Sequence, residues 1–126
     1  MPKAAPDAAV AVLGASPKPD RFSFKAVHLL KSRGYRPIPV HPAGHAVDRI
    51  AGVRSLDDLP VLPDTVTVYV NAGISDQERD KILRLHPRRV IFNPGAENPS
   101  LAADLEAAGI EVVEECTLVM LRKNDF

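Results

Sequence analysis

The sequence contains a single cysteine, Cys116, among its 126 residues. One cysteine cannot form a disulfide within the chain, and the sequence has no CxxC motif or cysteine–histidine cluster of the kind that makes a structural zinc site. Disulfides are typical of secreted domains and are rare in the reducing cytoplasm. The cysteine content therefore predicts a cytoplasmic protein that folds without covalent cross-links or structural metal.

The chain also lacks net charge and long apolar runs. Sixteen Lys and Arg residues balance sixteen Asp and Glu residues, which removes the positive field that supports non-specific binding to nucleic acid or anionic membranes. The apolar run Ala8–Leu13 is far shorter than a membrane span, and Met1–Asp7 lacks the features of a signal peptide. We expect neither nucleic acid nor a membrane as a partner.

The composition is otherwise that of an ordinary globular protein, with 45% hydrophobic and 25% charged residues. A chain of this length can bury about two thirds of its unfolded surface when it folds. No repeat, low-complexity block or long linker divides it. We therefore expect one domain, residues 1–126, with its own core.

Apolar runs alternate with amphipathic segments from one end of the chain to the other, which predicts alternating strands and helices. Ser75 and Glu78 have the spacing of a capping box, so the second helix is predicted to begin at Ser75. The predicted strands are Ala8–Leu13, Arg36–Val40, Thr65–Val70, Arg89–Phe92 and Ile110–Val113, and the predicted helices are Ser23–Arg33, Ser75–Leu85 and a segment from Asn98-Pro99 to Gly109.

This alternation predicts an α/β protein with a Rossmann-like, doubly wound sheet of five mainly parallel strands. Right-handed crossovers would add the second and third strands on one side of the first, giving the order 3-2-1-4-5. Pro37 and Pro39 in the second strand cannot donate ladder hydrogen bonds, so this strand must pair in a way that needs no backbone donor at these two positions. Ligands of such sheets bind where the strand order reverses, which places the predicted site between the first and fourth strands, at Gly14–Phe22 and Asn93–Asn98.

The segment from Gly14 to Arg21 has the parts of a phosphate-binding loop. Gly14 permits a tight turn and the close approach of a ligand, and the start of the following helix favours an anion. Ser16 adds a hydroxyl, while Lys18 and Arg21 add two cations. A plain strand-to-helix turn with solvated cations is the alternative, because the segment lacks GxGxxG.

The end of the second predicted strand argues against NAD. A dinucleotide site of the NAD type needs an acidic residue there to accept the ribose hydroxyls. This chain has Val40-His41-Pro42 at that place, and its next carboxylate, Asp48, comes well past the strand. A nucleotide with a phosphorylated ribose remains compatible with the sequence.

At this point the chain resembles the small stand-alone CoA-binding proteins, whose Rossmann-like domain is related to the CoA-binding domain of the succinyl-CoA synthetase alpha subunit. The resemblance covers nearly the whole chain. It is most specific in GASPKPDR and GYRPIPVHP, and the matching stretches are Val10–Phe24, Leu29–Pro42, Ser55–Pro60 and Ala107–Cys116.

The resemblance implies the following ligand contacts. Phosphate contacts are implied for Gly14, Ala15, Ser16, Lys18 and Arg21, adenosine contacts for Pro39, Val40, His41 and Pro42, and contacts from the loop after the fourth strand for Asn93 and Gly95. Two positions depart from the family. His41 stands where asparagine is usual, and Val70-Asn71 stands where a Phe-Arg pair is common.

No catalytic or metal site is predicted. His28, His45 and His86 have no second ligand at metal spacing, and Ser16 has no base nearby in sequence. Cys116 is interpreted as a small packed residue or, alternatively, as a thiol able to approach that of CoA. The pairs Asp57-Asp58 and Glu114-Glu115 are interpreted as solvated charge.

We therefore expect a protein that binds CoA or acyl-CoA without catalysis. The alternatives are an enzyme acting on acyl-CoA or NAD(P), and a regulatory or assembly module that uses a nucleotide structurally. The small-molecule nucleotide is the only partner that the sequence indicates. A homodimer is compatible with it, and no other protein partner is specified.

Overall fold

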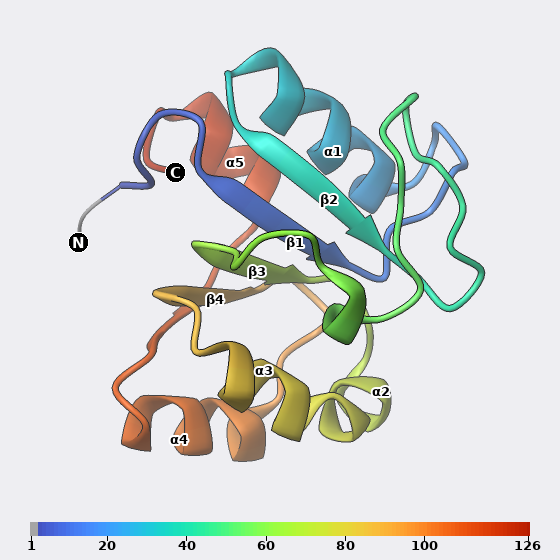
Figure 1. The fold of residues 1–126 in the computed structure, drawn as a ribbon. Coiled ribbons are helices and arrows are strands. Elements are labelled where there is room, and N and C mark those ends of the chain that lie inside the picture. Colours follow the sequence, from blue (N-terminus) through green and yellow to red (C-terminus); the bar gives the residue numbers. More distant parts are fainter. Residues whose placement is uncertain (1–2) are drawn as a thin grey trace.

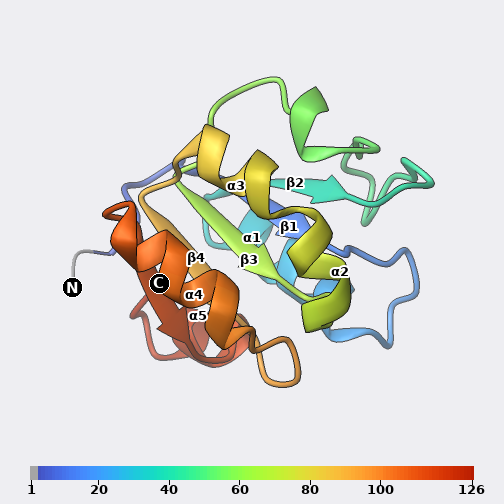
Figure 2. The same cartoon turned by 90° about the horizontal axis from the view of Figure 1, so that it is seen from below.

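Five parallel strands form one sheet at the centre of the computed structural model, which describes residues 3–126. Helices α1 and α5 cover one face of the sheet, and α2, α3 and α4 cover the other (Figure 1; Figure 2). The predicted Rossmann-like, doubly wound α/β architecture is therefore confirmed. The strands are β1 (Ala9–Leu13), β2 (Arg36–Val40), β3 (Thr65–Val68), β4 (Arg89–Phe92) and β5 (Glu111–Glu114); the helices are α1 (Phe22–Ser32), α2 (Ala72–Gln77), α3 (Arg79–Leu85), α4 (Pro99–Ala107) and α5 (Thr117–Arg122), with a 3-10 turn, η1, at Leu56–Asp58.

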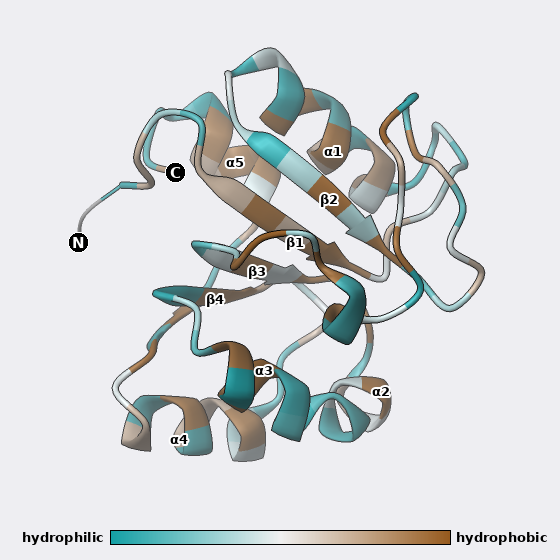
Figure 3. Cartoon of the chain, in the orientation of Figure 1, coloured by the Kyte–Doolittle hydropathy of each residue, from teal (hydrophilic) through white to brown (hydrophobic). Residues whose placement is uncertain are grey.

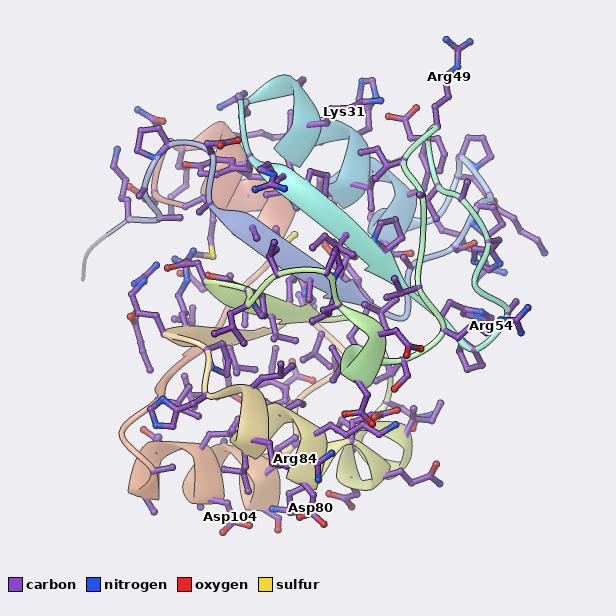
Figure 4. All side chains as sticks on the ribbon, in the orientation of Figure 1. Lys31, Arg49, Arg54, Asp80, Arg84 and Asp104 are labelled. Carbon is purple, nitrogen blue, oxygen red and sulfur yellow. The ribbon has the colours of Figure 1, made fainter. Side chains whose placement is uncertain are left out.

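Both faces of the sheet are buried, as the uninterrupted apolar runs predict. Along β1, Val10 and Val12 pack on the side of α1 and α5, whereas Ala11 and Leu13 pack on the side of α3 and α4. Brown apolar segments accordingly follow the strands in Figure 3, while teal polar residues mark the outer helix surfaces. Asp80, Arg84 and Asp104 project outward from α3 and α4 (Figure 4).

The strand order is β2-β1-β3-β4-β5, so the predicted order 3-2-1-4-5 is wrong in the position of the third strand. The chain after β2 forms only η1 and crosses back to pair Thr65 of β3 with Val10 of β1. Arg36 donates to Ala8 O on the β1 side, and donors alternate along a strand. The outward donors of β2 would therefore fall at Pro37 and Pro39, which have no N–H group, so a strand beside these positions would find no donor. The end of this edge is bridged at Val40 and Val53, where the Val53 amide donates to Pro39 O.

The helix starts were predicted with mixed success. Asn98 caps α4 by accepting from the Leu101 amide at 3.1 Å, and Pro99 is its first residue, as predicted. The predicted start at Ser75 is wrong, because Asn71 caps the helix by accepting from the Ile74 amide at 3.0 Å. The predicted single helix is also two helices, α2 and α3, which meet at Glu78.

All the described elements pack on this one sheet. The predicted domain 1–126 also includes Met1 and Pro2, which lie outside the described residues. Among residues 3–126, no helix has the length and apolar character needed to cross a membrane.

Candidate functional site

The strand order reverses between β1 and β3. From β1 the chain adds β2 on one side of the sheet, and from β3 it adds β4 and then β5 on the other side. The loops after these two strands meet at the carboxyl edge of the sheet. Gly14 turns the chain after β1 with a φ of +88°, and a Cβ atom on it would lie 2.6 Å from Val70 Cγ1. Glycine is needed here both for this φ and for the close approach of the two loops. The candidate site thus lies at β1 and β3, not between β1 and β4 as predicted.

Hydrogen bonds to β2 and α1 hold the loop 14–21 in place. The amides of Gly14 and Ala15 both donate to Val40 O, at 2.9 and 3.3 Å. The Ser16 amide donates to Ser23 Oγ at 3.0 Å. These three amides are already engaged, so the loop is preformed, and a ligand must find its donors elsewhere.

Donors suited to an anion lie at the start of α1. Arg21 occupies the N-cap position without a side-chain cap bond, and the first turn has no acidic residue. The first amides of a helix lack intrahelical acceptors and carry partial positive charge. The side chains of Lys18 and Arg21 are exposed beside them, against the single carboxylate of Asp20. This end of the loop is therefore rich in donors and net positive.

Two adjacent hollows lie along the carboxyl edge of the sheet. The first, the loop hollow, has a volume of about 280 Å³ and is lined by Gly14, Ser16, Arg21, Phe22, Ser23, Tyr69 and Pro94. The second, the Cys116 hollow, has a volume of about 170 Å³ and is lined by Phe22, Tyr69, Asn93, Pro94 and Cys116. Phe22, Tyr69 and Pro94 line both, so the two hollows share walls and together extend from the loop 14–21 to Cys116.

Two histidine rings stack beyond the end of β2. The centroids of His41 and His45 are 4.5 Å apart, with 28° between the ring planes. His45 Nε2 lies 3.1 Å from Ala15 O, and because a carbonyl can only accept, this nitrogen carries a proton. His41 Nδ1 accepts from the Ala43 amide at 3.0 Å. His45 therefore links the connection between β2 and β3 to the loop 14–21.

Burial and the neighbouring His45 lower the pKa of His41 below its ordinary value of 6.5. The folded chain then binds fewer protons than the unfolded chain between the lowered pKa and pH 6.5, so the free energy of unfolding falls as the pH falls through this window. We expect His41→Asn to reduce this acid sensitivity, since an asparagine oxygen can still accept from the Ala43 amide. Urea unfolding of both proteins between pH 5 and 7.5 measures the two slopes. Equal slopes would show that His41 titrates as it does in the unfolded chain.

The residues predicted along the adenosine differ in their exposure. Pro39 and Val40 are buried, so their side chains face the protein interior. Pro42 is exposed and His41 is partly exposed. Of these four residues, only His41 and Pro42 offer side-chain surface to a ligand.

Asn93, predicted as a ligand residue, is 2% exposed and bonded within the protein. Its Nδ2 donates to Thr67 Oγ1 at 2.7 Å and to Val68 O at 2.9 Å, and its Oδ1 accepts from the Thr117 amide at 2.8 Å. Asn93 therefore joins β3, β4 and α5 and forms a firm wall of the Cys116 hollow. Gly95 is exposed in the same loop.

Phe22 and Pro94 lie inside the two loops predicted to form the site, but neither was predicted as a wall of a hollow. Tyr69, which lines both hollows, and His45, which supports the loop 14–21, were not predicted as site residues. Tyr69 was not predicted because the third strand was expected beyond β2, where its end would lie far from the loop after β1. With β3 beside β1, the residues directly after β3 fall next to Gly14. Phe22 is 68% exposed at the start of α1, and that exposure is visible only in the structure.

The remaining candidate groups have local roles. His28 Nδ1 lies 2.9 Å from Asp48 Oδ2, and Asp57 pairs with Arg84. His86 Nε2 lies 2.9 Å from Ala108 O. Within the described part of the chain, no group of three or more His, Cys, Asp or Glu side chains is placed to hold a metal ion.

Comparison with known proteins gives consistent matches. Residues 8–122 match the sequence model of a family described as a CoA binding domain. An uncharacterised protein of known crystal structure is 40% identical, with a TM-score of 0.87 over 94% of this chain and 98% of that one. A Thermus thermophilus protein is 31% identical, with a TM-score of 0.87 over 95% and 91%. A dinucleotide-forming acetyl-coenzyme A synthetase from Ca. Korarchaeum cryptofilum shares the fold at 16% identity, with a TM-score of 0.73 over 87% of this chain and 26% of the synthetase.

Proposed function

This chain belongs to the CoA binding domain family, and from that membership we propose that it binds CoA or an acyl-CoA at the loop 14–21 without chemical conversion. The observation that carries the proposal is the start of α1. There, uncapped helix amides and the Arg21 side chain adjoin the loop hollow, which Arg21 itself lines. Charge-assisted hydrogen bonds from such donors are the usual means of holding a pyrophosphate.

The end of β2 supports a phosphorylated ribose rather than the free ribose of NAD. The residues that follow the strand, His41 and Pro42, bring no carboxylate to the position that binds ribose hydroxyls in NAD sites. The nearest carboxylate along the chain, Asp48, pairs with His28 and Lys31 instead. CoA carries a 3′-phosphate on its ribose and is therefore the better match.

The state of the polar side chains supports binding without catalysis. Ser16 Oγ accepts from the Lys18 amide at 3.2 Å, and no histidine or carboxylate among residues 3–126 bonds to this hydroxyl to activate it. A nucleophile needs such a base within hydrogen-bond reach. Acetyl-CoA incubated with the protein should accordingly be recovered unchanged by chromatography, and its hydrolysis above the protein-free rate would favour the enzyme alternative.

Thermal unfolding should separate CoA from NAD. At a CoA concentration about 100 times its Kd, binding adds about 2.7 kcal/mol to the free energy of unfolding and raises Tm by roughly 10 °C. NAD at the same concentration should leave Tm nearly unchanged, because no acidic residue follows β2. Equal shifts with the two nucleotides would contradict the assignment to CoA.

A further inference from the structure

The Cys116 hollow lies beyond the groups assigned to phosphate binding, at the ends of β4 and β5. It adjoins the loop hollow through Phe22, Tyr69 and Pro94. In the order β1-β3-β4-β5, three steps of about 4.8 Å separate β1 from β5, roughly 14 Å in all. An extended pantetheine arm that leaves a pyrophosphate at the loop 14–21 can cover this distance along the edge of the sheet.

The walls of the Cys116 hollow offer almost no polar groups. Both N–H groups of Asn93 are bonded inside the protein. The Tyr69 hydroxyl is shielded from solvent, and its burial and the nearby Cys116 raise its pKa well above the ordinary value, so it stays protonated and brings no charge to the hollow. Phe22 and Pro94 have no polar side-chain atoms. The partly exposed thiol of Cys116 is the one reactive side-chain group lining this hollow in the described structure.

We propose that the Cys116 hollow receives the sulfur end of CoA, either as the free thiol or with a short acyl group. The inference rests on the proposed binding of CoA at the loop 14–21. Apolar walls match the thiol or thioester and the few carbons beyond it, since nothing there repays the burial of a charged or strongly polar group. The volume of about 170 Å³ is well below the roughly 300 Å³ at which pockets begin to enclose drug-sized ligands, so the hollow cannot enclose a long acyl chain and would leave most of it in water.

Filling the hollow tests this inference. Cys116→Phe places a ring in the space, and Cys116→Ala is the matched control that leaves it open. Calorimetric titration of the whole protein with CoA, acetyl-CoA, palmitoyl-CoA and adenosine 3′,5′-bisphosphate measures each affinity. We expect Cys116→Phe to weaken CoA and acetyl-CoA by at least about tenfold and to leave the bisphosphate within about twofold of the wild type. Cys116→Ala should stay within about threefold for all four ligands.

Two results would overturn the inference. One is CoA binding by Cys116→Phe as tight as by the wild type, and the other is palmitoyl-CoA binding to the wild type more tightly than acetyl-CoA. If the bisphosphate fails to bind the wild type, the proposed phosphate loop fails instead.

A second measurement needs no variant that could misfold. The Cys116 thiolate attacks one sulfur of CoA disulfide, a protein–CoA disulfide forms, and one CoA leaves as its thiolate. If the hollow holds the sulfur end, intact mass should show this adduct forming at a rate that saturates with CoA disulfide. Adenosine 3′,5′-bisphosphate should suppress it. A rate that is linear in CoA disulfide and unaffected by the bisphosphate would contradict the inference.

Discussion

Replacing Lys18 and Arg21 together with alanine is expected to lower the affinity for CoA by at least roughly 100-fold. A hydrogen bond between a cation and phosphate contributes about 1.5–3 kcal/mol, and two are removed. The free energy of unfolding of the ligand-free protein should hardly change, because both side chains are exposed and only their backbone groups take part in the loop's hydrogen bonds. Of the single variants, Arg21→Ala should have the larger effect, because Arg21 lines the loop hollow and Lys18 does not.

Calorimetric titration with CoA measures the loss, and Arg49→Ala is the matched control. Arg49 is an exposed cation that points away from the protein at the tip of the connection between β2 and β3 (Figure 4). This variant removes one positive charge without touching the loop hollow. A similar loss of affinity in Arg49→Ala would mean that overall charge, rather than the loop, attracts CoA. Full affinity in the double variant would place the phosphates elsewhere.

The second large effect is expected from Gly14→Ala, with Gly34→Ala as its control. Gly14 and Gly34 have nearly the same φ, +88° and +89°, so alanine at either position bears the same left-handed strain of about 1–2 kcal/mol. A Cβ atom at Gly34 meets nothing within 4 Å, whereas at Gly14 it would lie 2.6 Å from Val70 Cγ1 and 3.4 Å from the backbone of Tyr69. Only Gly14→Ala therefore separates the loops after β1 and β3.

We expect both glycine variants to lose stability but only Gly14→Ala to lose CoA affinity, by roughly tenfold or more. Urea unfolding and calorimetric titration of the two proteins give the two quantities independently. Adding Val70→Ala to Gly14→Ala removes the contact at Val70 and should restore part of the affinity. Equal affinity losses at Gly14 and Gly34 would show that general destabilisation, not the loop geometry, weakens binding.

Most of the fold could be predicted from local patterns, because buried strands and helix caps are signalled by a few adjacent residues. Asn98-Pro99 marked the start of α4 correctly. The start predicted at Ser75 is wrong because Asn71, four residues earlier, is an equally good capping residue and accepts from the Ile74 amide, which leaves Ser75 inside α2. Strand order is not a local property. Here the order depended on whether a strand could pair with the outer edge of β2. Pro37 and Pro39 occupy the two outward donor positions of that edge, and they were the sign in the sequence that β2 is an edge strand.

The candidate site also has one part that could be predicted from adjacent residues and another that depends on the strand order. The loop 14–21 was recognisable because phosphate binding needs glycine, cations and a helix start within a few residues. The walls of the two hollows come from the ends of separate strands and become neighbours only when the strand order is correct. Asn93 shows the converse, since its position next to the site was predicted but its bonds to Thr67 and Thr117 could not be inferred from sequence spacing.

The prolines of β2 also affect the tendency of this protein to aggregate at high concentration. An open sheet edge invites the strand of another molecule, and that pairing begins many aggregates. A strand approaching β2 from outside meets no amide donor at 37 or 39, and Pro39 O is already taken by the Val53 amide at 2.9 Å. At the other edge, β5 is only four residues long and begins and ends with Glu111 and Glu114. Both edges of the sheet thus resist extension by another strand, which protects the folded chain against strand-mediated aggregation.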